Sequence, residues 1–363
     1  MRQMTVGWLA LAGLALSASQ ALAVTCTPVT GFTWIYEPGT PLTAAIINPT
    51  TPITTDVDAT GCSIGVYYGP GKTGSVTGAS IHGANYFGVV NNGAAVDVSN
   101  SAIYGIKDPS DDEGELGQRG VGVYFAYGSH ASGSIDCNTV WDYQLAGILV
   151  SGPYAFAVIT NNTVIGWGPT DRIIQTGIQI GYSTGAYVRA NTMTGNSYTG
   201  EIPGAGAGIL AVGGPCYSGP LQTAAQIEAN VGTGNDVGVW MANLDESCAP
   251  VNTPTFNQAI GNNLTNNGIN NVELGGYQAG ILDEGDFDSI RNNYICGIGY
   301  AAPQTVFFPP PFLLSIDTTY TNNPTVNGNI ICPTPQPSSI TRVTSSVSRG
   351  GSGGGRPRPL AVH

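Results

Sequence analysis

Three stretches of the chain share one pattern: Ile135-Asp136-Cys137-Asn138-Thr139-Val140, Ile159-Thr160-Asn161-Asn162-Thr163-Val164 and Val188-Arg189-Ala190-Asn191-Thr192-Met193. Each begins with a β-branched residue, has Asn in fourth place and ends on an apolar residue. The pattern recurs, with some variation, at Val76, Val98, Ile227, Ile260, Ile290 and Val326, which makes nine copies. The shortest interval is 22 residues. The longer intervals fit loop insertions into the coils of a solenoid.

A second phrase, Gly followed by a β-branched residue, precedes the first in most coils. It occurs at Gly88, Gly122, Gly147, Gly177, Gly208, Gly238 and Gly280, and more weakly at Gly65. Two short strands per coil, with inward residues alternating with outward ones, are typical of β-structure. The sequence therefore predicts an all-β protein, a right-handed parallel β-helix of about nine coils.

The fourth position of the first phrase predicts a column of asparagines at one bend of every coil. Its members are Asn138, Asn162, Asn191, Asn230, Asn263, Asn293 and Asn329, with Ala79 and Ser101 in the first two copies. A short amide bonds to local backbone and tolerates unusual backbone angles. Amides stacked at about 4.8 Å can also bond to one another. We expect these residues to form a structural ladder and to have no catalytic role.

The nine phrases resemble the parallel β-helix repeats of the pectin-lyase-like superfamily, over roughly residues 64 to 333. The resemblance implies that the Asn ladder lies between the second and third sheets and that the Gly strands form the first sheet. It also implies a substrate groove along the first sheet. The superfamily includes polysaccharide lyases and hydrolases, phage tailspikes and secreted proteins without a known activity, so the reaction stays open. Trp141-Asp142 is not followed by the His of the pectate lyase pattern, and the polygalacturonase signature is absent.

The two ends of the chain differ from the repeats. Residues 1–23 are predicted to be a secretory signal peptide, with Arg2 before an apolar run and Ala21-Leu22-Ala23 as cleavage site. The apolar run is too short to span a membrane, so we expect a secreted or periplasmic bacterial protein without a membrane span. Residues 24–63 are expected to cap the solenoid of residues 64–334. Residues 335–363 are expected to be a disordered tail of Ser, Gly, Pro and Arg.

The charge of the chain limits its partners. Signal and tail hold five of the eleven basic residues, which leaves six against 23 acidic residues in the rest. This balance disfavours nucleic acid, because phosphate binding needs clustered Lys and Arg. It also repels an anionic polysaccharide, unless Ca²⁺ bridges the two. We expect no other cofactor.

Seven cysteines in an exported chain predict disulfides and one cysteine left over. The coil register predicts three pairs: Cys26–Cys62, Cys216–Cys248 and Cys296–Cys332. Cys137 remains, at a bend beside the ladder. We expect it to be a small buried thiol; the alternative is a nucleophile or metal ligand.

The outward residues of the Gly strands form an apolar column: Tyr124, Leu149, Gln179, Leu210, Trp240 and Leu282. A stripe of this kind is not left in open water. It is either a platform on which sugars stack or a surface covered by a loop, by the tail or by another subunit. A further outward column is expected at Asp136, Thr160, Arg189, Glu228, Gly261 and Arg291.

Three long loops are expected to converge over that apolar column, because they belong to successive coils. They are residues 104–119, 166–176 and 195–206. Carboxylates from different coils could supply the acid and the base or nucleophile of glycoside cleavage. The candidate catalytic residues are Asp111, Asp112, Asp171, Arg172 and Glu201, and the candidate substrate-binding residues are Tyr124, Trp167, Gln179, Tyr198 and Trp240. Alternatively, Asp108, Asp111, Asp112 and Glu113 hold Ca²⁺, or the first loop is simply solvated.

Asp283 breaks the pattern of its own column. The other members, which should point inward, are apolar: Phe125, Val150, Ile180, Ala211 and Met241. Asp283 is therefore either buried, at a cost in free energy, or exposed because its strand has already ended.

The leading hypothesis is a secreted β-helix protein that binds a polysaccharide or a cell-surface glycan and, if it is an enzyme, cleaves it. Hydrolysis by paired carboxylates is favoured over lyase chemistry, since lyases neutralise a uronate with cations and the basic residues here are scattered. The competing hypothesis is a non-catalytic surface or envelope protein that serves adhesion or self-association.

Overall fold

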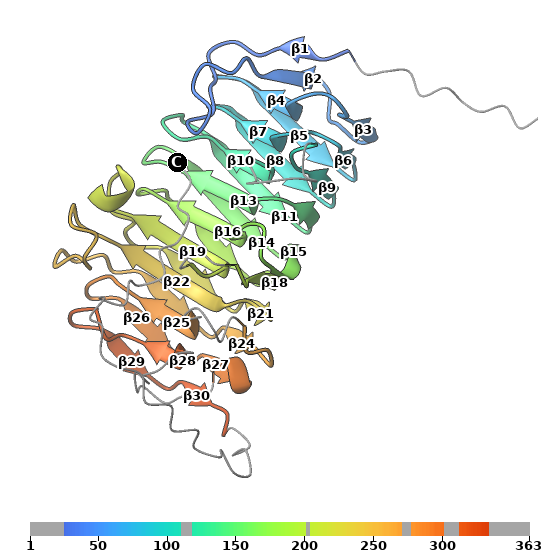
Figure 1. Cartoon of the computed structure of the whole chain (residues 1–363). Coiled ribbons are helices and arrows are strands. Elements are labelled where there is room, and N and C mark those ends of the chain that lie inside the picture. Colours follow the sequence, from blue (N-terminus) through green and yellow to red (C-terminus); the bar gives the residue numbers. More distant parts are fainter. Residues whose placement is uncertain (1–24, 110–117, 201–203, 271–276, 301–311, 334–363) are drawn as a thin grey trace, which may run out of the picture.

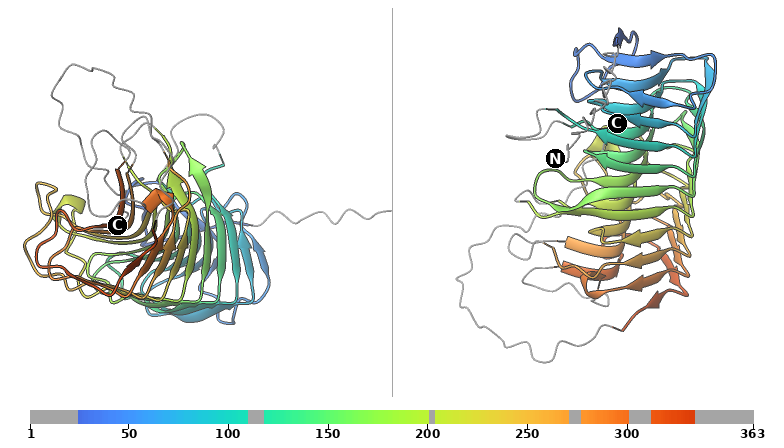
Figure 2. Two further views of the ribbon diagram at one scale, coloured as in Figure 1. Left: turned by 90° about the horizontal axis from the view of Figure 1, so that it is seen from below. Right: turned by 90° about the vertical axis from the view of Figure 1, so that its right-hand side faces the viewer.

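The computed structural model describes residues 25–109, 118–200, 204–270, 277–300 and 312–333. In these residues the chain winds into a solenoid with three β-sheets along one axis (Figure 1). The left view of Figure 2 looks along the stacked coils. Neighbouring strands are parallel, apart from the first two, β1 and β2, which pair antiparallel. The predicted signal peptide and tail lie outside the described residues.

From β4 onward each coil contributes one strand to each sheet, and the predicted right-handed parallel β-helix is confirmed. The first sheet contains β1 (Thr27–Pro28), β2 (Thr43–Ile47), β4 (Ile64–Tyr68), β7 (Phe87–Asn91), β10 (Val121–Phe125), β13 (Ala146–Ser151), β16 (Thr176–Gly181), β19 (Ala207–Gly213), β22 (Val237–Asn243), β25 (Tyr277–Asp283) and β28 (Phe312–Asp317). The second contains β5 (Thr73–Thr77), β8 (Ala95–Ser99), β11 (Ser132–Asp136), β14 (Phe156–Thr160), β17 (Tyr187–Arg189), β20 (Gln226–Glu228), β23 (Gln258–Ile260), β26 (Ser289–Arg291) and β29 (Thr325–Asn327). The third contains β3 (Asp56–Asp58), β6 (Ser80–His82), β9 (Ala102–Ile106), β12 (Thr139–Tyr143), β15 (Thr163–Thr170), β18 (Thr192–Tyr198), β21 (Val231–Thr233), β24 (Asn263–Thr265), β27 (Tyr294–Cys296) and β30 (Ile330–Ile331). Two short 3₁₀ helices, η1 (Pro215–Tyr217) and η2 (Ile298–Tyr300), interrupt the turns.

The Gly phrases lie on the first sheet, as expected, and the coil spacing explains them. A Cβ added to Gly88 would lie 2.5 Å from the carbonyl oxygen of Gly122 one coil later. A Cβ added to Gly122 would meet the oxygen of Gly147 at the same distance. Such contacts are sterically forbidden, so glycine is required where successive coils approach this closely.

The core lies between the three sheets and is filled by the inward residues of all of them. Seven of the nine β-branched anchors of the first phrase point inward from the second sheet and are fully buried: Val76, Val98, Ile135, Ile159, Val188, Ile227 and Ile290. Burial of one such side chain stabilises the fold by about 1.5–3 kcal/mol relative to its exposure.

The asparagine ladder runs along the bend between the second and third sheets. Asn138 Nδ2 donates to Asn162 Oδ1 at 3.0 Å, and Asn162 Nδ2 donates to Asn191 Oδ1 at 2.9 Å. The backbone N–H of each asparagine donates to the same oxygen as its amide does. Ser101 extends the ladder, since its Oγ accepts from the Ala79 backbone N–H at 3.2 Å. The structural role is confirmed.

One rung was assigned wrongly from the sequence. The ladder residue of its coil is Asn262, whose Nδ2 donates to Asn293 Oδ1 at 2.9 Å, and Asn263 is exposed. The pairing of β20 with β23 sets Ala259 beside Ile227 and Ile260 beside Glu228. The small Ala259 therefore takes the inward anchor position. Ile260, and not Gly261, stands in the outward column of Glu228.

The three predicted disulfides are confirmed. Cys26–Cys62, Cys216–Cys248 and Cys296–Cys332 have Cα–Cα distances of 5.4, 4.9 and 4.9 Å. Cys137 is unpaired, but the expected buried thiol is wrong, because its side chain is exposed at a bend with φ of 55°. A hydrogen bond to the Asp136 carboxylate raises the pKa of the Cys137 thiol, which reduces the reactive thiolate.

The outer face of the first sheet is covered by the chain itself. At its N-terminal end Trp34 packs on Phe87 and Tyr124, with ring centroids 5.0 and 5.7 Å away. Further along, Leu210 and Trp240 belong to a second buried cluster on the same face. The whole outward column from Tyr124 to Leu282 is at most 3% exposed. This burial matches the covered alternative for the apolar stripe.

Asp283 points inward and is fully buried, so the exposed alternative is excluded. It pairs with Met241 in the first sheet, and its Oδ1 accepts from the Gly285 N–H at 3.0 Å. Burial, and then the charge of Asp288, raise the pKa of Asp283 well above its ordinary value.

Candidate functional site

The predicted substrate-binding residues on the first sheet are inaccessible in the described structure. Tyr124 is 3% exposed, and Gln179 and Trp240 are fully buried. Trp240 Nε1 donates to Glu284 Oε2 at 2.9 Å. These side chains present no open surface on which a sugar could stack.

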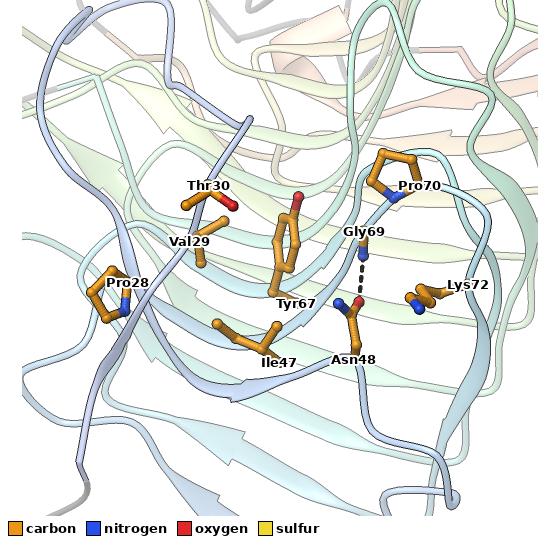
Figure 3. Close-up of a pocket in the computed structure, with 9 residues that line it drawn as sticks. All are labelled: Pro28, Val29, Thr30, Ile47, Asn48, Tyr67, Gly69, Pro70 and Lys72. Atoms are coloured by element: carbon orange, nitrogen blue, oxygen red, sulfur yellow. Dashed lines mark hydrogen bonds between the residues drawn. The ribbon is translucent and has the colours of Figure 1, made fainter.

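A small cavity of about 240 Å³ does open on the first sheet, near its N-terminal end (Figure 3). It lies between the segment Pro28–Thr30 and the ring of Tyr67, with Lys72 at its side. Its polar groups are largely engaged: Asn48 Oδ1 accepts from the Gly69 N–H at 2.7 Å, and Asn92 Nδ2 donates to the Tyr67 hydroxyl at 2.8 Å. Ligand pockets usually exceed about 300 Å³, so this cavity suits a few waters or a small fragment.

The predicted catalytic residues are only partly described. Asp111, Asp112 and Glu201 lie outside the described residues. Asp171 and Arg172 are exposed on the second loop, and Tyr198 of the third loop is buried. The second and third loops do adjoin, because Thr170 in β15 pairs with Tyr198 in β18. These assignments stay predictions.

Three coils converge on a residue that was not predicted, Asp142, directly after Trp141 in β12. Its Oδ1 accepts from Lys107 Nζ at 3.1 Å, and Lys107 belongs to the first loop. The same oxygen accepts from Trp167 Nε1 of the second loop, also at 3.1 Å. The ammonium of Lys107 lies 5.9 Å from the centroid of the Trp167 ring, within range of a cation–π contact. We call Asp142, Lys107 and Trp167 the Asp142 cluster.

The backbone of Asp142 is strained. Its φ is 49°, in the left-handed region that favours glycine. Glycine stands at the same position in the two preceding coils, Gly83 and Gly105, which pair in register with β12 and have φ of 76° and 62°. A carboxylate in a column of glycines is the sequence signal that could have revealed the site. Strain of this kind persists where the side chain has a role.

A larger cavity, about 480 Å³, opens beside the Asp142 cluster. Its lining comes from the turns that follow the third sheet: Thr60, Gly61, Gly83, Asn85, Gly105, Lys107, Asp108 and Pro109. Lys107 is the member of the Asp142 cluster that lines the cavity, and Asp142 Oδ2 lies 3.9 Å from the point where a Cβ of the lining residue Gly105 would stand. The volume is within the usual range for a small-molecule site.

A second cation, Arg119, holds Asp108, which is one of the residues that line this cavity. Arg119 binds Asp108 at 2.6 Å and Glu37 at 3.4 Å, and its guanidinium lies 4.8 Å from the centroid of the Tyr86 ring. The Asp108 N–H donates to Gln144 Oε1 at 2.7 Å. Asp108 is therefore held by a cation. Asp111, Asp112 and Glu113 lie outside the described residues, so the Ca²⁺ alternative stays a prediction.

An aromatic stack leads along the outer face of the third sheet to the cluster. His82 stacks on Tyr104 at 5.0 Å, and Tyr104 stacks on Trp141 at 4.4 Å. Because Tyr104 lies between the other two rings, both of its faces are occupied and neither is open to a sugar. We assign the stack a supporting role, since it fixes the strand that ends at Asp142.

The third loop is held by a buried acid. Asp236 Oδ2 accepts from the Tyr198 and Gly206 N–H groups at 2.7 and 2.9 Å, and its Oδ1 accepts from Ser197 at 2.8 Å. Burial raises the pKa of Asp236 to about 6, although these hydrogen bonds oppose the shift. The group is an anchor for the loop, because its oxygens are already occupied.

The described residues contain neither a cluster of metal ligands nor a helix that could span a membrane. No three His, Cys, Asp or Glu side chains there are placed to hold a metal ion together. Nor does that part of the chain contain a helix of the length and apolarity needed to cross a membrane.

Three stacked sheets, glycine-dependent coil contacts and an Asn ladder define a right-handed parallel β-helix protein. Residues 46–219 match the family model described as a right handed beta helix region. This match and the three parallel sheets agree on the right-handed parallel β-helix fold, which the resemblance to the pectin-lyase-like superfamily implied. No curated protein matches it. Among solved structures, DFA-IIIase from Arthrobacter chlorophenolicus A6, without its lid, aligns with a TM-score of 0.41 and 11% identity, over 81% of this chain and 71% of that chain.

Proposed function

We propose that this protein binds a neutral glycan at the Asp142 cluster and the adjoining cavity. The observation that carries the proposal is the shared oxygen of Asp142, which accepts from Trp167 and from Lys107, a residue that lines a cavity of about 480 Å³. Three successive coils supply the three side chains, so the rigid solenoid fixes their geometry.

The chemistry of the cluster suits a sugar. Hydroxyl groups both donate and accept hydrogen bonds, and the cluster offers a carboxylate beside an ammonium. The half-buried Trp167 ring adds an apolar surface of the kind against which sugar C–H groups pack. Strain at Asp142 supports a functional reading, because glycine would fit the same turn without it.

A neutral glycan is preferred over an anionic one. Asp142, Asp108 and Glu37 surround the two cations Lys107 and Arg119, so no positive charge is left over at the site. The excess of acidic over basic residues in the whole chain also repels an anionic glycan.

We further propose that the protein works outside the cytoplasm, secreted or in a bacterial periplasm. Three disulfides are typical of an oxidising compartment. The predicted signal peptide is consistent with export.

Binding is preferred over cleavage as the activity of the cluster. Lys107 engages Asp142, and Arg119 engages Asp108, so both described acids at the cavity serve as fixed acceptors. Hydrolysis by Asp111, Asp112 or Glu201 is the competing hypothesis. Release of reducing sugar by the wild type, lost in Asp111→Asn/Asp112→Asn, would establish that hypothesis instead.

The Asp142→Gly variant is expected to separate binding from folding. Glycine adopts the backbone angle of this turn without strain, so we expect the melting temperature to stay within about 2 °C of wild type. Loss of the charged acceptor is expected to lower glycan affinity about ten-fold or more. Isothermal titration with soluble glucose, xylose, mannose and N-acetylglucosamine oligomers, with oligogalacturonate as the anionic comparison, measures the affinity.

The two lysines of the chain provide a matched control. Lys107→Met is expected to weaken binding as Asp142→Gly does, and Lys72→Met, at the small cavity of Figure 3, is expected to leave it unchanged. A loss confined to Lys72→Met would place the ligand on the first sheet. Absence of binding to any glycan, together with concentration-dependent self-association, would support the adhesion hypothesis instead.

A further inference from the structure

A column of side chains at the corner between the first and second sheets combines exposure with backbone strain. Successive coils place there Phe156, Gly185, Ala224, Phe256 and Phe287. The backbone confirms the register: Gly185 N–H donates to Ala155 O, Ala224 N–H to Thr255 O and Phe256 N–H to Asp286 O. We call this column the corner ridge. It lies on a different edge of the solenoid from the Asp142 cluster, which follows the third sheet.

Three members of the ridge have an energetically unfavourable backbone. Ala224, Phe256 and Phe287 have φ of 55°, 55° and 56°, which costs a non-glycine residue about 1–2 kcal/mol each. The side chains of Phe256 and Phe287 are nevertheless 55% and 48% exposed, so little burial compensates the strain at these two residues. Asn323 takes the next position of the column with φ of 48°, as expected for a left-handed turn. Glycine or asparagine would fit the turns at Phe256 and Phe287 better than phenylalanine does. The presence of phenylalanine therefore indicates a function for the two exposed rings.

Hydrogen bonds to the buried carboxylate of Asp288 fix the turn that contains Phe256. Thr255 Oγ1 and the Asn257 N–H both donate to Asp288 Oδ1 at 2.6 Å. Asn257 Nδ2 donates to Asp288 Oδ2 at 3.2 Å. The residues on both sides of Phe256 are thus fixed to one buried carboxylate. A strained residue persists where its surroundings determine it in this way.

Phenylalanine rings project at both ends of the ridge, and small residues lie between them. We call the low part at Gly185 and Ala224 the saddle. The Phe156 ring leans over Gly185, where an added Cβ would lie 3.1 Å from Phe156 Cδ2. Ala224 follows, and then the paired rings of Phe256 and Phe287, with centroids 6.0 Å apart. Phe156 and Phe256 are three coils apart, which is about 14 Å along the axis.

Amide groups flank the saddle. Gln226 and Gln258 follow Ala224 and Phe256 by two residues and point outward from the second sheet, in register with each other. Gln226 is exposed and Gln258 is half-buried. Exposed aromatic rings, small residues between Phe156 and the Phe256–Phe287 pair, and neutral donors and acceptors alongside are the components of a carbohydrate-binding face. A contiguous apolar patch, as in a protein interface, is not formed, because Gly185 and Ala224 separate the rings.

We propose that the corner ridge binds an extended neutral polysaccharide that lies along the solenoid axis. Its sugar rings would stack on Phe256 and Phe287 at one end and on Phe156 at the other, over the saddle at Gly185 and Ala224. The proposal goes beyond the Asp142 cluster and does not depend on it. A short oligosaccharide would occupy the cavity beside the Asp142 cluster, and a polymer would bind along the corner ridge.

The test is a pull-down of the full chain with insoluble cellulose, chitin and β-1,3-glucan. The Phe256→Asn/Phe287→Asn variant removes both rings and places at each turn the residue found at Asn323. We expect its binding to at least one polymer to fall about ten-fold or more. Its melting temperature should be equal to or higher than that of wild type, since the strain is reduced. Tyr294→Asn, which removes a ring of 44% exposure from the third sheet, is the matched control and should bind as wild type.

Further outcomes separate the two sites. Lys107→Met should leave polymer binding intact, and Phe256→Asn/Phe287→Asn should leave oligosaccharide titration intact. The ridge proposal is overturned if wild type binds none of the three polymers or if the double variant binds them equally well. It is also overturned if the rings prove to mediate dimerisation, seen as a dimer of wild type that the double variant lacks in analytical ultracentrifugation.

Discussion

Asn262→Ala is expected to lower the free energy of unfolding by about 3–5 kcal/mol, because it removes one rung from the middle of the ladder. Asn262 Nδ2 donates to Ile227 O at 3.0 Å and to Asn293 Oδ1 at 2.9 Å. Its Oδ1 accepts from the backbone N–H and the amide of Asn230, both at 3.0 Å. Alanine leaves several of these groups buried without a partner, each at a cost of about 1–3 kcal/mol.

The neighbouring residue supplies the control. Asn263→Ala removes an exposed side chain of β24 and is expected to change the free energy of unfolding by less than about 0.5 kcal/mol. Urea denaturation followed by circular dichroism measures both. Equal effects of the two substitutions, or a larger effect at Asn263, would show that the ladder does not run through Asn262.

Asp283→Asn is expected to stabilise the protein at neutral pH by about 1–3 kcal/mol. The pKa of Asp283 is raised in the folded state, first by burial and then by the charge of Asp288. The pKa of the partner Asp288 is raised as well, by burial, although hydrogen bonds from Thr255 and Asn257 oppose the shift. The native state therefore holds a proton that the unfolded chain releases near pH 4.

The raised pKa of Asp283 determines whether the stability of the protein rises or falls with pH. The favourable contribution of Asp283 is fully present below about pH 4 and is lost as the pH rises through its raised folded-state pKa. Thermal unfolding of the wild type from pH 4 to pH 8 should therefore show a decline that Asp283→Asn reduces. Asp245, an exposed aspartate whose pKa is lowered by the Ser247 hydroxyl, is the control, and Asp245→Asn should not stabilise at pH 7. A variant Asp283→Asn that melts below wild type at pH 7 would mean that the ionised carboxylate supports the fold.

The repeated phrases were sufficient to predict the coils and the three disulfides, because both depend on the register between neighbouring coils, which the periodic pattern sets. The assignment of the Gly strands to the first sheet came from the resemblance to the pectin-lyase-like superfamily. The error at Asn263 has a local cause. Ala259-Ile260 and Asn262-Asn263 each offer two candidates for one position, and only the pairing with β20 decides between them.

The candidate site was harder to predict, because its contacts are not periodic. The outward direction of Tyr124 could be inferred, but its cover could not, since Phe32 and Trp34 reach the first sheet from a segment without repeats. Lys107, Asp142 and Trp167 meet across three coils through long side chains. At Asp142, Phe256 and Phe287 the decisive feature is the backbone angle, which the residue type does not reveal.

The most direct test of glycan binding is a crystal structure of the protein soaked with the neutral oligosaccharide that binds best in titration. The account predicts a sugar ring in the cavity beside Trp167, with hydroxyl groups within hydrogen-bonding distance of Asp142 Oδ2 and Lys107 Nζ. A sugar bound over Tyr124 and Trp240 on the first sheet, with the cavity at Asp142 empty, would contradict it.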